Sequence, residues 1–152
     1  IVSTLLVEVG MAVGYGMATA LPTRLVCFAV MVSPVGAWLR QYLSKFNSLV
    51  PSIPIGTLLA NALGTIITMV IAILTWRDEA LSASPIVRDE NLRIILTGIV
   101  LAGSGDLSTV SSFVKEVKVI GEKNIWLGVR YTLVTFVVGQ IIGAIFWGIY
   151  FA

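Results

Sequence analysis

Polar residues crowd one stretch of a chain that is otherwise apolar enough for a membrane. Between Thr97 and Glu116 the sequence TGIVLAGSGDLSTVSSFVKE holds several hydroxyls, a carboxylate at Asp106 and two close glycines. In hydrocarbon, broken helix survives only where protein or a watery cavity receives it. Freed carbonyls could hold a cation, whereas helix N–H ends and hydroxyls could face an anion. Tight helix packing is the alternative, but the number of hydroxyls together with Asp106 favours an ion or ligand site.

The hydroxyls of this stretch fall on two adjacent helical faces, occupied by Ser104, Ser108 and Ser111 and by Thr109 and Ser112, with Phe113 directly after them. An earlier polar stripe has spacings of four, four and three, and consists of Thr57, Asn61, Thr65 and Thr68. Threonine hydroxyls in such spans often bond their own helix. The amide of Asn61 cannot be hidden so easily, so it either holds two helices together or lines a pore.

A third polar face lies in the last apolar run, where four-residue spacing aligns Tyr131, Thr135, Gly139 and Gly143. The glycines indicate contact with another helix. Tyr131 either adds a phenolic donor to a pore or is an ordinary interfacial tyrosine.

The composition that must position these residues is that of a membrane protein. Of 152 residues, 57% are hydrophobic and 12% charged, and the mean hydropathy is +0.98. Apolar runs of about the length that crosses a bilayer as helix occur at Ile1–Leu21, Leu25–Leu43, Ile55–Trp76, Ile94–Val114 and Ile125–Phe151. We therefore predict an all-α integral membrane protein with five crossings, of which the fourth is irregular.

The connections are predicted from polar and proline-rich stretches at 44–54, 77–93 and 115–124. Glu8 interrupts the first run, so it lies either near the membrane interface or beside a partner inside the bundle. The predicted connections place four Lys and Arg residues on one side of the membrane and six on the other. This bias is too weak to fix the orientation of the chain in the membrane.

Several function classes are disfavoured. The chain has no histidine, which removes the commonest zinc ligand and proton shuttle, and its single Cys27 cannot form a disulfide within the chain. A net charge of +2 from scattered residues gives no argument for nucleic acid. The sequence has no nucleophile paired with a base at helical spacing and no GxxxxGK[ST] motif. We therefore expect neither an enzyme nor a nucleotide-driven pump.

Three segments in order resemble the signature blocks of the fluoride channel (CrcB/Fluc) and eukaryotic fluoride exporter (FEX) family. They are VGAWLRQYLS at 35–44, PIGTLLANALGT at 54–65 and GDLSTVSSFVKE at 105–116, and the likeness extends over 24–152. The resemblance implies a four-helix unit over 23–152 whose third helix is broken, paired with an inverted copy on a second subunit or a fused half. It also implies that residues 1–22 form an extra connecting transmembrane helix.

The same resemblance implies roles for single residues. Asn61 matches a pore asparagine and Phe113 a phenylalanine whose ring edge lines the ion path; Arg40 matches an arginine that ends a helix. Further positions match pore-side hydroxyls at Ser108, Thr109, Ser111 and Ser112, and backbone carbonyls for a structural Na⁺ at Gly105, Ser108 and Thr109.

Two positions depart from the family pattern. Val110 stands where bacterial members have another phenylalanine, and Asp106 replaces a small or neutral residue. A carboxylate beside an anion path would repel the anion unless it pairs with the bound cation or lies off the path.

The resulting expectation is a passive fluoride-selective channel of the plasma membrane that exports fluoride and confers fluoride resistance. Its partners would be fluoride, the inverted half and the lipid bilayer. Two alternatives remain at this point. One is a non-conducting half of an inverted-repeat channel; the other is a small coupled transporter of cationic drugs that uses Glu8 or Asp106.

Overall fold

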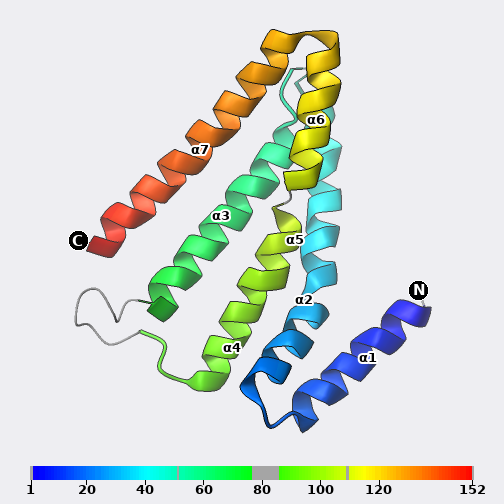
Figure 1. The fold of residues 1–152 in the computed structure, drawn as a ribbon, viewed down its shortest axis with the longest axis vertical. Coiled ribbons are helices and arrows are strands. Elements are labelled where there is room, and N and C mark those ends of the chain that lie inside the picture. The colour runs from blue at the N-terminus through cyan, green and yellow to red at the C-terminus, as the bar shows by residue number, and fades with distance from the viewer. Residues whose placement is uncertain (1, 51, 77–85, 109, 152) are drawn as a thin grey trace.

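The computed structural model describes residues 2–50, 52–76, 86–108 and 110–151. All its regular elements are helical, as predicted (Figure 1), and they are α1 Val2–Met17, α2 Leu21–Ser44, the 3₁₀ turn η1 Lys45–Ser48, α3 Ile55–Trp76, α4 Glu90–Gly98, the π-helical segment η2 Ile99–Ser104, α5 Gly105–Leu107, α6 Val110–Lys123 and α7 Ile125–Phe151. Among these described residues, four helical stretches are long and apolar enough to cross a membrane, namely Leu21–Ser48, Ile55–Thr75, Glu90–Lys123 and Ile125–Tyr150.

The first predicted crossing is a shorter helix. α1 has 16 residues, which is about 24 Å of helix, whereas the hydrocarbon core is about 30 Å thick. The chain turns early because Ala20 is extended and Pro22 occupies the first turn of α2, where its missing N–H costs nothing. The role of α1 as an additional span stays a prediction.

Arg24 joins α1 to the rest of the bundle at the base of α2. Its guanidinium lies 4.8 Å from the centre of the Tyr15 ring in α1 and donates to Asn91 Oδ1 in α4 at 2.7 Å. Glu8 lies partly exposed farther along α1 and has no hydrogen bond or ion pair among the described residues. Its position at the membrane interface stays a prediction.

The fourth span is broken, as the sequence predicted. α4 begins at an Asp89 cap, whose carboxylate accepts from the Leu92 N–H at 2.7 Å. The helix then widens into η2, where Ser104 Oγ donates back to the Val100 carbonyl at 2.7 Å. α5 ends after one turn because Ser108 is extended, with φ −95° and ψ 108°. π-helical turns of this kind are frequent at functional sites.

Two glycines let the break pack closely between α2 and α3. A Cβ on Gly36 would lie 2.2 Å from the Gly103 carbonyl oxygen, and a Cβ on Gly64 would lie 2.8 Å from Ser108 Cβ. Both glycines are buried. The backbone of the broken span therefore lies against two continuous helices, which receive it inside the protein rather than in lipid.

The Gly36→Ala variant is expected to be less stable than the wild type by about 1–3 kcal/mol, the usual cost of overpacking. The neighbouring atom is a backbone oxygen, which no rotamer change can move aside. Gly105→Ala is the control, because a Cβ there would meet nothing closer than 3.7 Å. Thermal denaturation of the detergent-purified protein measures the difference, and equal midpoints for the two variants would contradict the packing assignment.

The predicted loop over 115–124 is wrong. α6 continues to Lys123, and α7 starts two residues later at Ile125, with Asn124 Oδ1 accepting from the Trp126 N–H at 2.9 Å. The charged residues of this stretch suggested a loop, but its apolar residues repeat at helical spacing and form one side of an amphipathic helix. Gly128 and Gly121 then allow close contact, since a Cβ on Gly128 would lie 3.2 Å from Gly121 Cα.

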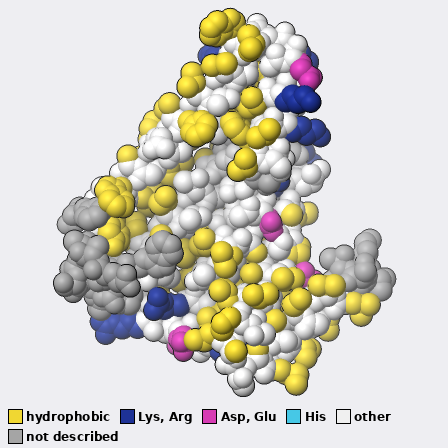
Figure 2. Space-filling view, viewed as in Figure 1, with side chains coloured by type: hydrophobic (Ala, Val, Ile, Leu, Met, Phe, Trp, Pro, Cys, Tyr) yellow, Lys and Arg dark blue, Asp and Glu magenta, His cyan; other side chains and the backbone are white. Residues whose placement is uncertain are grey.

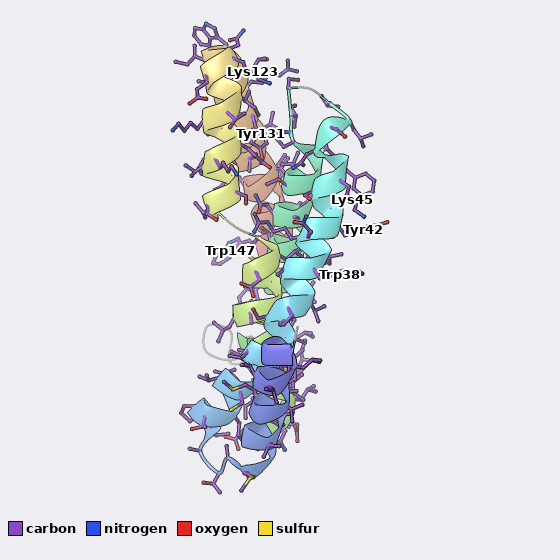
Figure 3. The ribbon with its side chains drawn as sticks, turned by 90° about the vertical axis from the view of Figure 1, so that its right-hand side faces the viewer. Trp38, Tyr42, Lys45, Lys123, Tyr131 and Trp147 are labelled. Carbon is purple, nitrogen blue, oxygen red and sulfur yellow. The ribbon has the colours of Figure 1, made fainter. Side chains whose placement is uncertain are left out.

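Aromatic residues mark the two ends of the span formed by α7. Trp126 and Trp147 are 77% and 67% exposed and lie about 31 Å apart along the helix axis, close to the thickness of the hydrocarbon core. Figure 2 shows charged side chains mostly toward the two ends of the visible face. On α2, Trp38 and Tyr42 stack with ring centres 6.3 Å apart and point away from the bundle with Lys45 (Figure 3). These positions are typical of side chains at the lipid interface.

Candidate functional site

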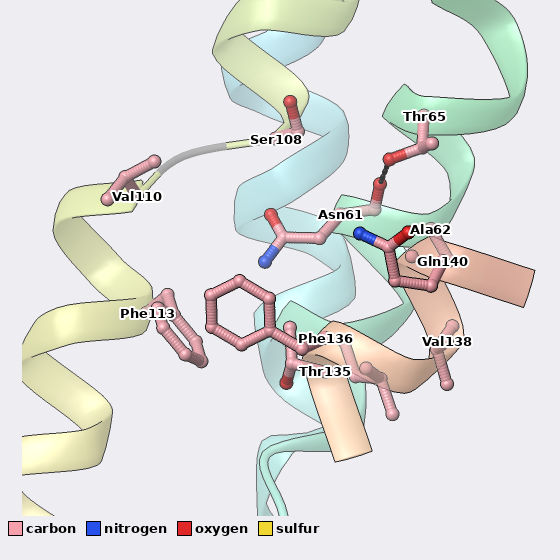
Figure 4. Close-up of a pocket in the computed structure, with 12 residues that line it drawn as sticks. Asn61, Ala62, Thr65, Ser108, Val110, Phe113, Thr135, Phe136, Val138 and Gln140 are labelled. Atoms are coloured by element: carbon pink, nitrogen blue, oxygen red, sulfur yellow. Dashed lines mark hydrogen bonds between the residues drawn. The ribbon is translucent and has the colours of Figure 1, made fainter. Parts of the chain in front are cut away.

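A cavity of about 340 Å³ opens between α3, the helix break, α6 and α7 (Figure 4). It is lined by Leu58, Asn61, Ala62, Thr65, Ser108, Val110, Phe113, Thr135, Phe136, Val138, Gly139 and Gln140. The residues of α7 among these lie about 14–21 Å along the helix from Trp126, near mid-membrane. No charged side chain is among the lining residues. The sequence predicted three of them as site residues, Asn61, Ser108 and Phe113, and the structure brings these three together.

The polar groups of the cavity differ in whether their protons are available. Thr65 donates to the Asn61 carbonyl and Thr135 to the Tyr131 carbonyl, both at 2.9 Å. These hydroxyls satisfy their own helices, as threonines in spans commonly do. In the part of the chain that the structure describes, the side chains of Asn61, Ser108 and Gln140 have no hydrogen bond. The cavity therefore presents three free donor groups and no charge.

Two aromatic rings complete its wall, Phe113 from α6 and Phe136 from α7. In Figure 4 both rings lie on the side toward which the Asn61 amide nitrogen points. Aromatic ring edges carry partial positive charge and attract anions weakly. Val110 also lines the cavity and is 74% exposed. Because its side chain is apolar, it contributes only apolar surface to the wall.

Tyr131 lies behind this wall and not in it. Its side chain is fully buried, and its ring packs against Phe113 with centres 5.4 Å apart. Its hydroxyl donates to Glu116 Oε2 at 3.0 Å, so the phenolic proton is already used. The geometry makes Tyr131 a support for Phe113 instead of a donor that lines the cavity.

Glu116 is the centre of a hydrogen-bond network that joins three helices and η1. Its Oε1 accepts from Thr57 Oγ1 at 2.6 Å and from Asn47 Nδ2 at 3.0 Å, while Oε2 accepts from Tyr131. Asn47 Oδ1 in turn accepts from the Thr57 backbone N–H at 2.9 Å. Three donors to one carboxylate satisfy a partly buried charge that would otherwise be costly. The network fixes α6 and α7 against the start of α3.

Of the other predicted site residues, those that the structure describes do not line the cavity. Ser111 is exposed on α6, and Ser112 accepts a hydrogen bond from Arg40 Nη2, which connects α6 to the last turns of α2. Arg40 thus lies near the end of its helix, as expected. Thr109 lies outside the described residues.

Asp106 is also placed away from the cavity. Its Oδ2 accepts a hydrogen bond from Ser33 Oγ in α2, and it is not among the cavity-lining residues. A carboxylate is compatible with an anion path if it pairs with a bound cation or lies off the path. The position of Asp106 outside the cavity agrees with the second condition.

Five cavity residues on α7 were not predicted to line a pore: Thr135, Phe136, Val138, Gly139 and Gln140. Thr135 and Gly139 were recognised as one helical face but interpreted as packing. A usable signal was present at Gln140, the one amide or charged residue between Tyr131 and Ala152. An amide in the middle of an apolar span needs a partner in the same way as Asn61 does.

Comparison with known proteins gives consistent results. The family described as CrcB-like protein, Camphor Resistance (CrcB), matches residues 27–149. Fluoride export protein 1 of Candida albicans is 39% identical over 90 residues, which are 59% of this chain and 23% of that protein. The fluoride-specific ion channel FluC of Pseudomonas putida is 44% identical over 85 residues, 55% of this chain and 58% of that protein.

A third relative, FluC of Thiobacillus denitrificans, is 35% identical over 94 residues, 61% of this chain and 68% of that protein. The chain thus spans about a quarter of the Candida protein and less than two thirds of the Pseudomonas one. No solved structure gives a significant match. Because the family match covers most of the chain and four helices are able to cross a bilayer, this is a multi-pass membrane protein that belongs to the CrcB-like family.

Proposed function

We propose that the chain forms part of a fluoride-selective channel that exports fluoride passively across the plasma membrane. The observation that carries the proposal is the neutral cavity at mid-membrane depth, with free donors on Asn61, Ser108 and Gln140. The names of the curated relatives, a fluoride export protein and fluoride-specific channels, support the choice of ion.

The chemistry of the cavity suits a small, strongly hydrated anion. Amide and hydroxyl protons can replace water donors as the ion leaves its hydration shell, and the ring edges of Phe113 and Phe136 add weak attraction. The absence of a lining cation avoids a permanent ion pair that would trap the anion. With no nucleotide motif in the sequence, the membrane potential supplies the driving force, and a negative interior moves the anion outward.

A homologous half in the opposite orientation would complete this channel. Gly139, Gly143 and Gly148 have nothing within 4 Å of an added Cβ, and Phe136 is 62% exposed beside the cavity. Glycines with open space beside them on a span allow another helix to approach closely. In this proposal α1 is the connecting helix, and α7 faces the second half across the cavity.

The helix break is the candidate site for a structural Na⁺. Oxygen ligands for such an ion would come from the last carbonyls of α5, because the extended Ser108 ends that helix and terminal carbonyls lack a following helical turn. Within the described residues no group of three His, Cys, Asp or Glu could hold a metal. Oxygen atoms of the backbone and of hydroxyls are a ligand type that hard cations prefer. A bound Na⁺ would supply positive charge that fixes the break.

The test is fluoride efflux from liposomes that contain the complete protein. We expect fluoride to leave when valinomycin and a K⁺ gradient set the voltage, and chloride to be retained in the same vesicles. Efflux that requires ATP or a proton gradient, or equal passage of chloride, would contradict a passive fluoride-selective channel.

A further inference from the structure

Three aromatic side chains form a continuous ladder along one outer face of α2 and η1. Trp38 and Tyr42 stack, and Phe46 meets the Tyr42 ring edge-on, with ring centres 6.1 Å apart and planes at 78°. Four-residue spacing places the three residues on one helical face. They are 70%, 47% and 37% exposed, and Trp38 and Tyr42 point away from the bundle (Figure 3). This aromatic ladder of Trp38, Tyr42 and Phe46 therefore presents its rings to lipid and not to the protein core.

A cation lies at the outer end of the aromatic ladder. Lys45 Nζ is 5.2 Å from the centre of the Tyr42 ring, within the range at which an aromatic face attracts a cation. Among the described residues the Lys45 ammonium makes no hydrogen bond or ion pair, so its protons remain available to a ligand. Lys45 lies about 10 Å beyond Trp38 along the helix axis. The surface thus combines a positive charge at the end of the span with an aromatic wall that leads from it into the membrane.

The charge of this end of the bundle indicates which class of lipid fits. Residues 40–54 and 112–130 lie where α2 and α6 finish and where α3 and α7 begin. They carry six Lys and Arg residues and two Glu residues. One of these, Glu116, already accepts three hydrogen bonds within the protein. Excess positive charge at a membrane surface attracts anionic lipid headgroups, so the surface favours an anionic phospholipid over a zwitterionic one.

The aromatic ladder lies away from the cavity. Neither its three residues nor Lys45 lines the cavity. Figure 1 shows α3 between α2 and α7, and α7 is the helix that would face the second half of the channel. Lipid can therefore reach the ladder whether or not the second half is in place.

We propose that Lys45 and the aromatic ladder bind an anionic phospholipid. The Lys45 ammonium pairs with the phosphate of the headgroup, and the glycerol and the upper acyl chain lie against Tyr42 and Trp38. Contact with the Tyr42 ring restricts the lysine side chain, so less conformational entropy is lost when the lipid binds. The proposal concerns the lipid around the protein and does not depend on which ion the protein conducts.

The test measures the quenching of Trp38 fluorescence by phospholipids with brominated acyl chains, in vesicles that contain the complete protein. Every tryptophan except Trp38 is replaced by phenylalanine. Trp38 lies at the depth of the upper acyl chain, where bromine quenches indole fluorescence by contact. At equal mole fraction, we expect brominated phosphatidylglycerol to bind beside Trp38 about fivefold more tightly than brominated phosphatidylcholine, the factor that one lysine near a membrane surface contributes.

Three variants assign this preference to single side chains. Lys45→Gln removes the charge and keeps much of the side-chain length, so the preference for phosphatidylglycerol should disappear. Tyr42→Leu keeps Lys45 but removes the ring, so the preference should fall; an unchanged preference would contradict the role of the ring. Lys118→Gln is the matched control. It removes the same charge from an exposed position on α6, at the same end of the bundle, where no cation–π contact occurs among the described residues, and it should keep the fivefold preference.

Three results would overturn the proposal. Equal quenching by the two lipids would exclude a preference for the anionic headgroup. Equal loss in Lys45→Gln and Lys118→Gln would indicate general attraction of anionic lipid to a basic surface. Quenching by neither lipid would mean that protein, such as a second copy of the chain, covers Trp38. Should the protein with Trp38 alone not fold, the thermal midpoint of the protein with all its tryptophans, in detergent with added phosphatidylglycerol or phosphatidylcholine, gives the same comparison between Lys45→Gln and Lys118→Gln.

Discussion

Fluoride efflux is expected to fall at least a hundredfold when Asn61 and Phe113 are both replaced by alanine. Asn61→Ala removes a free amide donor from the cavity, and Phe113→Ala removes a ring from its wall. A lost hydrogen bond to a charged group costs about 1.5–3 kcal/mol, and each 1.4 kcal/mol is a factor of ten in rate. The measurement is initial fluoride efflux per channel in liposomes, with incorporated protein quantified.

The matched control for this double variant is Leu59→Ala with Val114→Ala. These residues lie on the same two helices, are 44% and 56% exposed, and do not line the cavity. The control should conduct like the wild type. If the Asn61 and Phe113 variant also does, the cavity is not the fluoride pathway.

Glu116→Ala is expected to lower the free energy of unfolding by about 3 kcal/mol or more. The substitution leaves the hydroxyls of Thr57 and Tyr131 and the amide of Asn47 without their shared acceptor, and each hydrogen bond to a charged group contributes about 1.5–3 kcal/mol. Chemical denaturation in detergent measures the loss. Efflux should fall as well, because the Tyr131 ring that supports Phe113 is no longer held in place.

Two further variants isolate the role of the charge. Glu116→Gln keeps the size and one acceptor, so its loss should be smaller than that of Glu116→Ala. Glu122→Ala on the same helix should change stability by less than about 0.5 kcal/mol, since Glu122 is exposed and has no partner among the described residues. A Glu116→Ala protein as stable as Glu122→Ala would show that the network adds nothing to the fold.

The fold was largely predictable because apolar length is a strong signal. The predicted bounds Ile55–Trp76 and Ile125–Phe151 agree with α3 and α7, and the break in the fourth span is confirmed. The error at 115–124 has a physical cause. Charged residues there were interpreted as a loop, although a helix that extends beyond the bilayer can carry charge on its outer side and turn Glu116 inward to its hydrogen-bond donors.

The candidate site was predictable only in part. Asn61 and the break were recognisable because polar groups in a span require a partner. The cavity residues of α7 were not, because the roles of Gly139 and Phe136 can be assigned only when the neighbouring helices are known. The same holds for Tyr131 and Glu116, whose bond crosses between helices and satisfies a donor that appeared free in the sequence.

The network around Glu116 also has a consequence for biosynthesis. Asn47 and Thr57 leave the ribosome before Glu116, and Tyr131 leaves after it. If the helices enter the bilayer in chain order, the donors Asn47 and Thr57 are present when the Glu116 carboxylate is inserted, and α7 then adds the Tyr131 hydroxyl. A nascent chain that stops before α7 would carry this charge with only two of its three hydrogen-bond donors, so insertion of the last helix is the step that completes the network.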